Sequence, residues 1–245
     1  HYWLDLAQVT RNMRSFGLHT PKYRKVDWPN FPEFDSVGRW ESEFYEPEEW
    51  RNDYPNPAFV RMTERDAFWA AKIIVRFTEP ELRAIVETEQ FTNPAEYEYF
   101  LTVLIERQKK SARYYLNRMN PIDDFELTPA GLAFANLSER YGFAEPESRY
   151  QVQWSVYDNA TDQAEALGPP RELAEAVILL SEARGVTRND GRFLLAEIRT
   201  LHDNYPRWNR RVSVYLHPAE GAFEVVGIDR ETDPPSLGRG VGGRN

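Results

Sequence analysis

The sequence contains no cysteine among its 245 residues. Disulfide frameworks, cysteine zinc sites and thiol catalysis are therefore excluded. Long apolar runs are also missing: the longest, Ala176–Leu180, falls far short of the roughly 20 apolar residues of a membrane-spanning helix. Glycines cluster at Gly238–Gly243, but no predicted strand precedes them and no helix follows, so they do not form a phosphate-binding loop. We expect no membrane span and no nucleotide loop.

Positive charge is in deficit, with 30 lysine and arginine residues against 39 aspartate and glutamate residues and a net charge of −9. Because neutralisation of phosphates dominates nucleic-acid affinity, this charge argues against a general nucleic-acid binder, and we expect no nucleic-acid partner. Hydrophobic residues make up 41% of the chain and aromatic residues 14%, which is enough to fill buried cores. The composition therefore predicts a folded, acidic protein.

The chain opens on an apolar run, His1–Ala7, that contains one acidic residue, Asp5. The run suits a strand, but an isolated strand is at best marginal in water. The next hundred residues offer almost no strand partners. We therefore interpret the chain as the C-terminal piece of a larger protein, whose missing N-terminal portion is one expected partner and a separate protein the other.

Residues 20–58 combine prolines with large aromatic side chains, and eight acidic residues fall between positions 31 and 53. Proline interrupts regular ladders, whereas aromatic rings are effective buried anchors. The composition favours an ordered segment laid over a helical surface. A disordered linker is the alternative.

Three helices with clear start signals follow this segment. Thr63 with Asp66, and Thr78 with Glu81, have the spacing of capping boxes. Pro94 in the first helical position predicts the start of the longest helix, whose apolar residues keep helical spacing until about Arg118.

Beyond Pro121 the apolar pattern changes to the alternation of β-strands. The predicted strands are residues 125–127, 132–134, 150–157, 193–201, 212–216 and 223–228. The composition of residues 172–183 favours a helix, but its Val-Ile-Leu-Leu core also suits a strand, and both alternatives stay open. Many short antiparallel strands in so few residues indicate a β-sandwich-like domain.

Asp5 is the sharpest candidate for chemistry. A carboxylate just beyond a buried strand can hold a divalent cation that bridges phosphates. The alternative is that Asp5 caps the segment after it. Phosphoryl transfer also needs a phosphate loop, a lysine on a neighbouring strand and a catalytic-loop acid. None is recognisable here, so the sequence predicts no catalytic residue.

A basic cluster lies in the second half of the longest helix and comprises Arg107, Lys109, Lys110 and Arg113. Cations at this end complement the helix dipole and solvate an outer face. Alternatively, Arg107, Lys110 and Arg113 bind an anion.

Four segments resemble a family of large uncharacterised bacterial proteins, mostly from acidobacteria and similar environmental phyla, in which a kinase-like domain precedes a β domain. The segments are Tyr54–Phe59, Arg65–Lys72, Leu104–Arg107 and Asn120–Asp123. The resemblance implies an exported protein, periplasmic or extracellular, and a helical portion like the C-terminal lobe of a kinase. It also aligns Asp5 with a metal-binding aspartate, although Leu6 and Ala7 replace the Phe and Gly that follow that aspartate in the family.

The sequence thus predicts an α+β protein with a kinase-C-lobe-like helical domain (1–121), a β-sandwich-like domain (122–232) and a flexible tail (233–245). The first functional hypothesis is a non-catalytic binding protein, a fragment or degenerate relative of an exported kinase-like protein that carries no cofactor itself. The second is a metal-dependent phosphotransferase in the full-length protein, with magnesium held by Asp5. A third is a structural subunit of a surface assembly.

Overall fold

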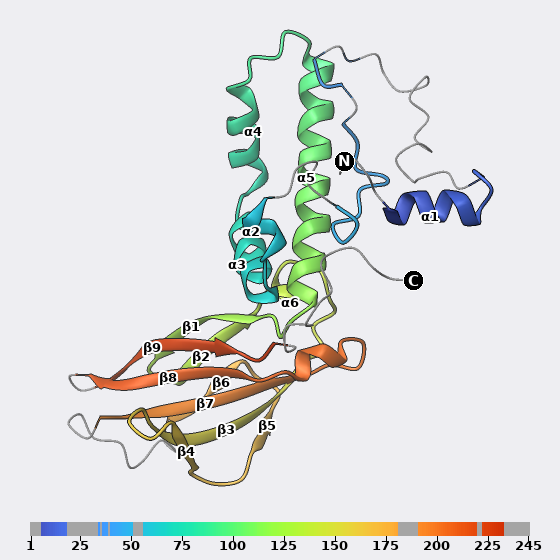
Figure 1. Ribbon diagram of the computed structural model, residues 1–245. Coiled ribbons are helices and arrows are strands. Elements are labelled where there is room, and N and C mark those ends of the chain that lie inside the picture. The colour runs from blue at the N-terminus through green and yellow to red at the C-terminus, as the bar shows by residue number, and fades with distance from the viewer. Residues whose placement is uncertain are drawn as a thin grey trace. The chain divides into compact units, whose positions relative to one another are not determined.

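The computed structural model describes residues 6–18, 34, 36–38, 40–50, 56–180, 191–219 and 222–232 of the chain (Figure 1). The chain divides into two compact units, residues 1–114 with 234–245, and residues 115–233. The first contains helices and the second is dominated by antiparallel sheets, which makes the protein α+β. The predicted boundary at residues 121 and 122 falls where the first strand begins, whereas the division by compactness falls earlier, within the longest helix.

Helix starts in the first unit follow the predicted caps. In both capping boxes the threonine side chain accepts a backbone N–H and the acidic side chain accepts the threonine N–H. Asn93 Oδ1 accepts the N–H of Ala95 at the start of the longest helix. The helices of this unit are α1 (Leu6–Arg14), α2 (Pro57–Val60), α3 (Glu64–Ile74), α4 (Glu79–Glu87) and α5 (Pro94–Asn117).

Helix α5 provides the packing surface for α4. Leu101 on α5 is buried against Leu82 and Val86 of α4, while Leu104 and Ile105 are half-buried at the edge of this cluster. The sequence predicted all three α5 residues as buried, which is correct for Leu101 alone.

Helix α1 corrects the first expectation of the sequence. Leu6 and Ala7 belong to a helix and not to a strand, and residues 1–5, with Asp5, lie outside the described residues. The physical reason is a helical spacing that continues from Leu6 through Val9 to Met13, without an intervening proline. The predicted flexible tail from residue 233 also lies outside the described residues.

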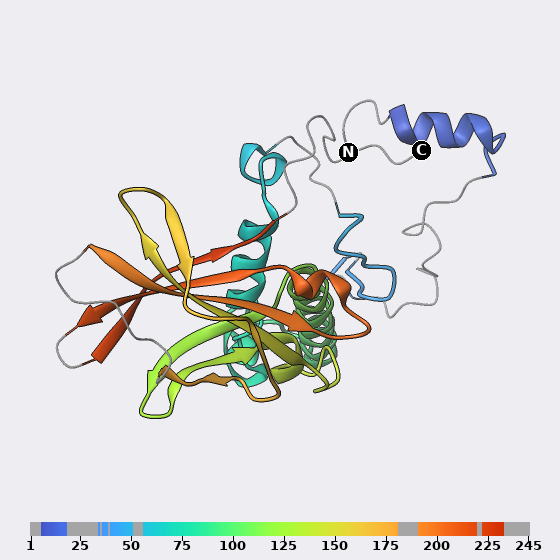
Figure 2. The ribbon, with the colours of Figure 1, turned by 90° about the horizontal axis from the view of Figure 1, so that it is seen from below.

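Two antiparallel sheets form most of the second unit (Figures 1 and 2). One has the order β1-β2-β6 and the other the order β4-β3-β7-β8-β9, with β5 also pairing with β3. All six predicted strands are present. The strand bounds are β1 (Ile122–Thr128), β2 (Gly131–Asn136), β3 (Arg149–Asp158), β4 (Gln163–Ala166), β5 (Arg171–Leu173), β6 (Val177–Ile178), β7 (Arg192–Leu201), β8 (Val212–Ala219) and β9 (Ala222–Arg230), and the unit also contains the short helices α6 (Leu137–Arg140) and η4 (Pro206–Asn209).

Residues 172–183 do not form the favoured helix where the structure describes them. Arg171–Leu173 pairs with β3, and Val177–Ile178 pairs with β2. Ile178 is buried in the core beside Leu132 and Phe134 of β2. Pairing with β2 and burial of Ile178 in the core stabilise the β-branched Val-Ile pair as a strand more than the helical composition stabilises a helix, so tertiary packing decides the local structure.

One hydrophobic core contains side chains from both sheets. Alternate residues of β3, β7 and β8 face it, as the period of two requires. Gly131, after the predicted turn, approaches β6 so closely that a Cβ there would lie 2.1 Å from the carbonyl oxygen of Ile178. Only glycine fits at this position. The buried core residues are Ile122, Leu132, Phe134, Tyr150, Val152, Trp154, Ile178, Leu194, Ala196, Ile198, Val212, Val214 and Leu216.

A buried polar network ties β9, β7 and the start of β1 together. The Arg230 guanidinium donates to the carbonyl oxygens of Asn120 (3.0 Å) and Ile122 (2.7 Å) and to Asp123 Oδ2 (2.9 Å). The Asn120 side chain accepts from Thr200 Oγ1 (2.7 Å). The Asn120–Asp123 segment, one of the four on which the family resemblance depends, therefore has a structural role.

None of the helices in the described part of the chain has the length and apolar character needed to cross a membrane. This agrees with the short apolar runs of the sequence.

Candidate binding site

Two cations of α5 hold the segment of residues 40–50 through its backbone. Lys110 Nζ donates to the carbonyl oxygens of Ser42 (2.7 Å), Glu43 (3.1 Å) and Tyr45 (3.4 Å). Arg107 Nε donates to the carbonyl oxygen of Glu41 (2.6 Å). These carbonyls are not in a strand and accept no hydrogen bonds from a neighbouring strand. The two cations supply the donors that a β-ladder would otherwise supply.

The Arg107 guanidinium also contacts two aromatic rings. Its central carbon lies 3.8 Å from the ring centroid of Trp40 and 4.6 Å from that of Tyr45. Ring faces are negative, so this arrangement is attractive and strengthens as water is removed. Burial lowers the pKa of Arg107 below its usual value, and the nearby Glu41 opposes that shift.

Trp40 and Tyr45 of the segment contact α5, in line with the predicted packing of the aromatic segment on the helices. The Trp40 ring stacks on Phe100, with centroids 5.6 Å apart and planes 18° apart. Tyr99 donates its hydroxyl hydrogen to the Trp40 carbonyl oxygen, and the hydroxyl groups of Tyr45 and Ser111 lie 2.9 Å apart. Of the other predicted aromatic anchors, residues 28, 31 and 54 lie outside the described residues.

A cavity of about 340 Å³ opens between this segment and the helices. The polar side chains of its lining have partners: Arg107 and Ser111 make the contacts described above, and Gln108 Nε2 donates to the carbonyl oxygens of Ile74 and Phe77, each at 2.8 Å. The other lining side chains are aromatic or aliphatic. The lining residues are Trp40, Tyr45, Trp50, Ile74, Phe77, Leu82, Leu104, Arg107, Gln108 and Ser111.

Exposed apolar side chains surround the mouth of the cavity. Trp50, Ile74 and Phe77 belong to its lining and are each at least 40% exposed. The Phe59 ring, also exposed, meets Trp50 edge to face with centroids 5.4 Å apart. A contiguous exposed apolar patch of this kind is a common mark of an interaction site.

Acidic side chains accompany these rings. The segment contributes four exposed glutamates, at positions 43, 46, 48 and 49. We call the cavity, the four residues at its mouth (Trp50, Phe59, Ile74 and Phe77) and these four glutamates the acidic aromatic surface.

The structure places the predicted site residues in different surroundings. Arg107 and Lys110 come together at the segment of residues 40–50, where both donate to backbone carbonyls, while Arg113 is exposed and does not line the cavity. Asp5 lies outside the described residues, so its metal role stays a prediction. Within the described residues no three His, Asp or Glu side chains gather as a metal site would require.

Sequence reasoning missed the cavity. Its walls come from residues up to about 70 positions apart, and only the aromatic content of residues 40–50 signalled a packed surface. Comparison of the chain with protein-family models, with curated proteins and with solved structures gives no match.

Proposed function

We propose that the chain is a non-catalytic binding protein whose acidic aromatic surface binds a basic segment of a protein with apolar anchor side chains. The observation that carries the proposal is the open cavity, which is lined by three aromatic residues of one segment and by exposed apolar groups, while the same segment carries four exposed glutamates. Rings in a concave site are strong anchors for an apolar side chain, and surrounding charges select the partner.

The residue types of the cavity favour binding over chemistry. Its described lining includes no histidine, carboxylate or lysine side chain to move a proton. Arg107 is engaged by Trp40, Tyr45 and a backbone carbonyl, and Ser111 by Tyr45. A nucleophile needs an adjacent base, and Ser111 has none among these neighbours.

The proposal is in keeping with the first hypothesis from the sequence, a degenerate relative or fragment of an exported kinase-like protein. Under this hypothesis the helical unit corresponds to the C-terminal lobe of a kinase-like domain, and the two sheets correspond to a sandwich-like domain. The Arg107 and Asn120–Asp123 positions of the resemblance have structural contacts here, which favours retention for folding and binding.

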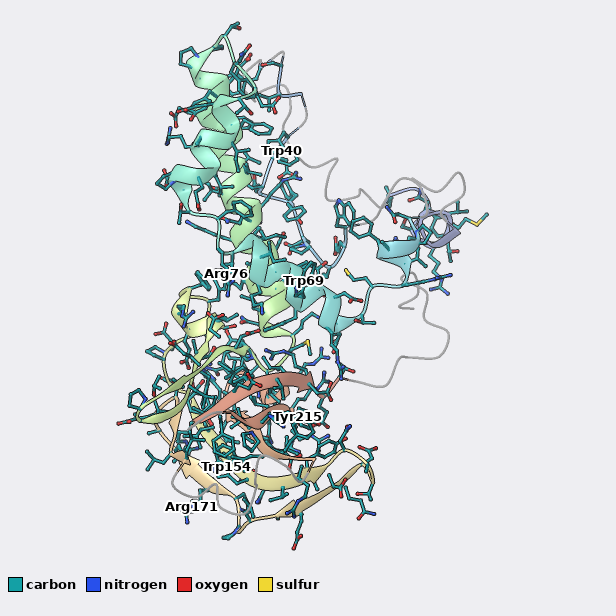
Figure 3. The ribbon with its side chains drawn as sticks, turned by 90° about the vertical axis from the view of Figure 1, so that its left-hand side faces the viewer. Trp40, Trp69, Arg76, Trp154, Arg171 and Tyr215 are labelled. Carbon is teal, nitrogen blue, oxygen red and sulfur yellow. The ribbon has the colours of Figure 1, made fainter. Side chains whose placement is uncertain are left out.

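The test is a fluorescence-anisotropy titration with a labelled amphipathic peptide of leucine and lysine. The wild-type chain should bind it, and Trp50→Ala should weaken binding at least about tenfold, as expected for an anchor residue. Trp69→Ala is the matched control, since Trp69 is 63% exposed on α3 and does not line the cavity (Figure 3).

The double substitution Glu46→Lys with Glu48→Lys in the wild-type chain should also weaken binding of the basic peptide and reduce the salt dependence of its affinity. Absence of binding to the wild-type chain, or equal losses for Trp50→Ala and Trp69→Ala, would contradict the proposal.

A further inference from the structure

Helix α1 and the residues just after it present apolar side chains that the described part of the chain leaves exposed. Met13 is 75% exposed and Phe16, which directly follows the helix, is 94% exposed. Val9, one turn before Met13, and Leu18 are exposed as well. Monomeric proteins rarely leave so many large apolar groups together in water, which points to a covering surface.

The length of α1 leads to the same conclusion. Helices of nine residues are marginal in water, because nucleation is costly and few hydrogen bonds follow it. The end of α1 is nevertheless well defined: Gly17, at φ +80°, donates its N–H to the Asn12 carbonyl oxygen at 2.8 Å. Packing of the apolar face is the remaining source of stability.

The charge of α1 is one-sided. Arg11 and Arg14 lie in its last turn, and Leu6–Arg14 contains no acidic residue. The acidic aromatic surface has the opposite character, because the segment that contributes the exposed Trp50 also carries four exposed glutamates.

We propose that α1 of one chain docks on the acidic aromatic surface of a second copy of this chain. The inference rests on the proposed function and names its ligand. Met13 and Phe16 are the anchors for the cavity, because methionine sulfur and aromatic rings both pack favourably against rings such as those of Trp40 and Trp50. Arg11 and Arg14 then face the glutamates.

A second copy is the occupant that the structure favours. Among the described residues of one copy none covers Met13 or Phe16, and the acidic aromatic surface has the charge opposite to that of α1. Each copy has both the helix and the surface, so two copies exchange α1 reciprocally and close a two-fold dimer. An anionic membrane is the other surface that suits a basic amphipathic helix, but the net charge of −9 opposes it.

The experiment measures the mass of the chain by light scattering during size exclusion over a range of concentrations. The wild-type chain should form a dimer, and Phe16→Asp and Trp50→Ala should each weaken dimerisation at least about tenfold. Trp69→Ala is again the control and should dimerise like the wild type. All three side chains are exposed, and circular dichroism verifies that each variant is folded.

A mixing experiment makes the test specific. Phe16→Asp keeps an intact surface and Trp50→Ala keeps an intact α1, so an equimolar mixture restores one of the two interfaces. The mixture should dimerise more strongly than either variant alone, whereas a general loss of folding would not be rescued.

Three outcomes would overturn the inference. The first is a wild-type chain that stays monomeric up to about 1 mM, the range of very weak association. The second is a dimer that Phe16→Asp leaves unchanged. The third is a monomer that binds phosphatidylglycerol vesicles through α1. If the leucine–lysine peptide still binds to a monomeric chain, the proposed function stands and only the identity of the partner is wrong.

Discussion

At the scale of single residues, long cationic side chains donate to backbone carbonyls in irregular segments and at the start of a strand. Arg107 and Lys110 donate to carbonyls of residues 41–45, and Arg230 donates to carbonyls at the start of β1. Arginine serves such positions well because its planar group presents several donors and stacks on rings.

Arg107→Lys tests this use of the guanidinium. Lysine keeps the charge but cannot stack between Trp40 and Tyr45 while donating to Glu41, so the variant should lose about 1–2 kcal/mol of local stability. Hydrogen exchange of residues 40–50 should accelerate accordingly, with Lys109→Arg as the control on an exposed position of α5. Unchanged exchange would mean that the rings hold the segment without the cation.

Arg230→Met removes one partner of a buried ion pair. Asp123 is only 5% exposed, so its carboxylate would be left buried without the cation, at a cost of about 3–5 kcal/mol. The double variant Asp123→Leu with Arg230→Met should recover much of that loss, since no charge then stays unpaired. Urea unfolding measures both, and a double variant no more stable than the single one would contradict this account.

At the scale of helices and strands, two nearby leucines of α5 differ in role: Leu101 belongs to the core and Leu104 to the cavity wall. Leu101 is 1% exposed within the α4–α5 cluster, whereas Leu104 is half-buried and lines the cavity. Leu101→Ala should cost about 2–5 kcal/mol and Leu104→Ala distinctly less. A larger loss of melting temperature for Leu104→Ala than for Leu101→Ala would contradict this assignment of the buried face of α5.

The capping boxes of α3 and α4 predict a loss of helix in acid. Hydrogen bonds from the Thr63 and Thr78 backbones lower the pKa of Asp66 and Glu81 below their ordinary values of 3.8 and 4.5. Their contribution to stability is complete above those ordinary values and is lost as the pH falls through the lowered folded values. Asp66→Asn with Glu81→Gln should flatten the acid limb of a helicity titration by circular dichroism, and an unchanged limb would contradict this.

Local patterns predicted the elements whose signals are contained within one stretch of sequence. The capped helices and the alternating strand of residues 150–157 are examples. The strand expected for the opening run is wrong for Leu6 and Ala7, while residues 1–5 lie outside the described residues. Residues 172–183 suited either structure in the sequence, and pairing with β3 and β2 decides for strands where the structure describes them. The site was predicted in part: Arg107 and Lys110 were singled out, but their backbone partners lie more than 60 residues away, and no spacing rule reveals such pairs.

At the scale of the whole molecule, the described elements differ in how much of their surface is buried. In the second unit one large hydrophobic core joins both sheets, and β7 is paired on both edges, by β3 and β8. In the first unit α4 is buried through Leu82 and Val86 against α5. Local opening requires the exposure of few apolar contacts in α4 and of many in β7.

This difference predicts the order of hydrogen exchange along the chain. The amides of β7 should exchange last, because they are released only when the shared core of the second unit unfolds. Those of α4 and of β4, whose four residues are all exposed, should exchange first. Mass spectrometry of exchanged peptides measures all three in one sample. The substitution Val214→Ala, in the core of β8, should accelerate β7 while α4 keeps its rate, since α4 opens within the other unit. A common rate for α4 and β7 in the wild-type chain would show instead that both units unfold as a single cooperative body.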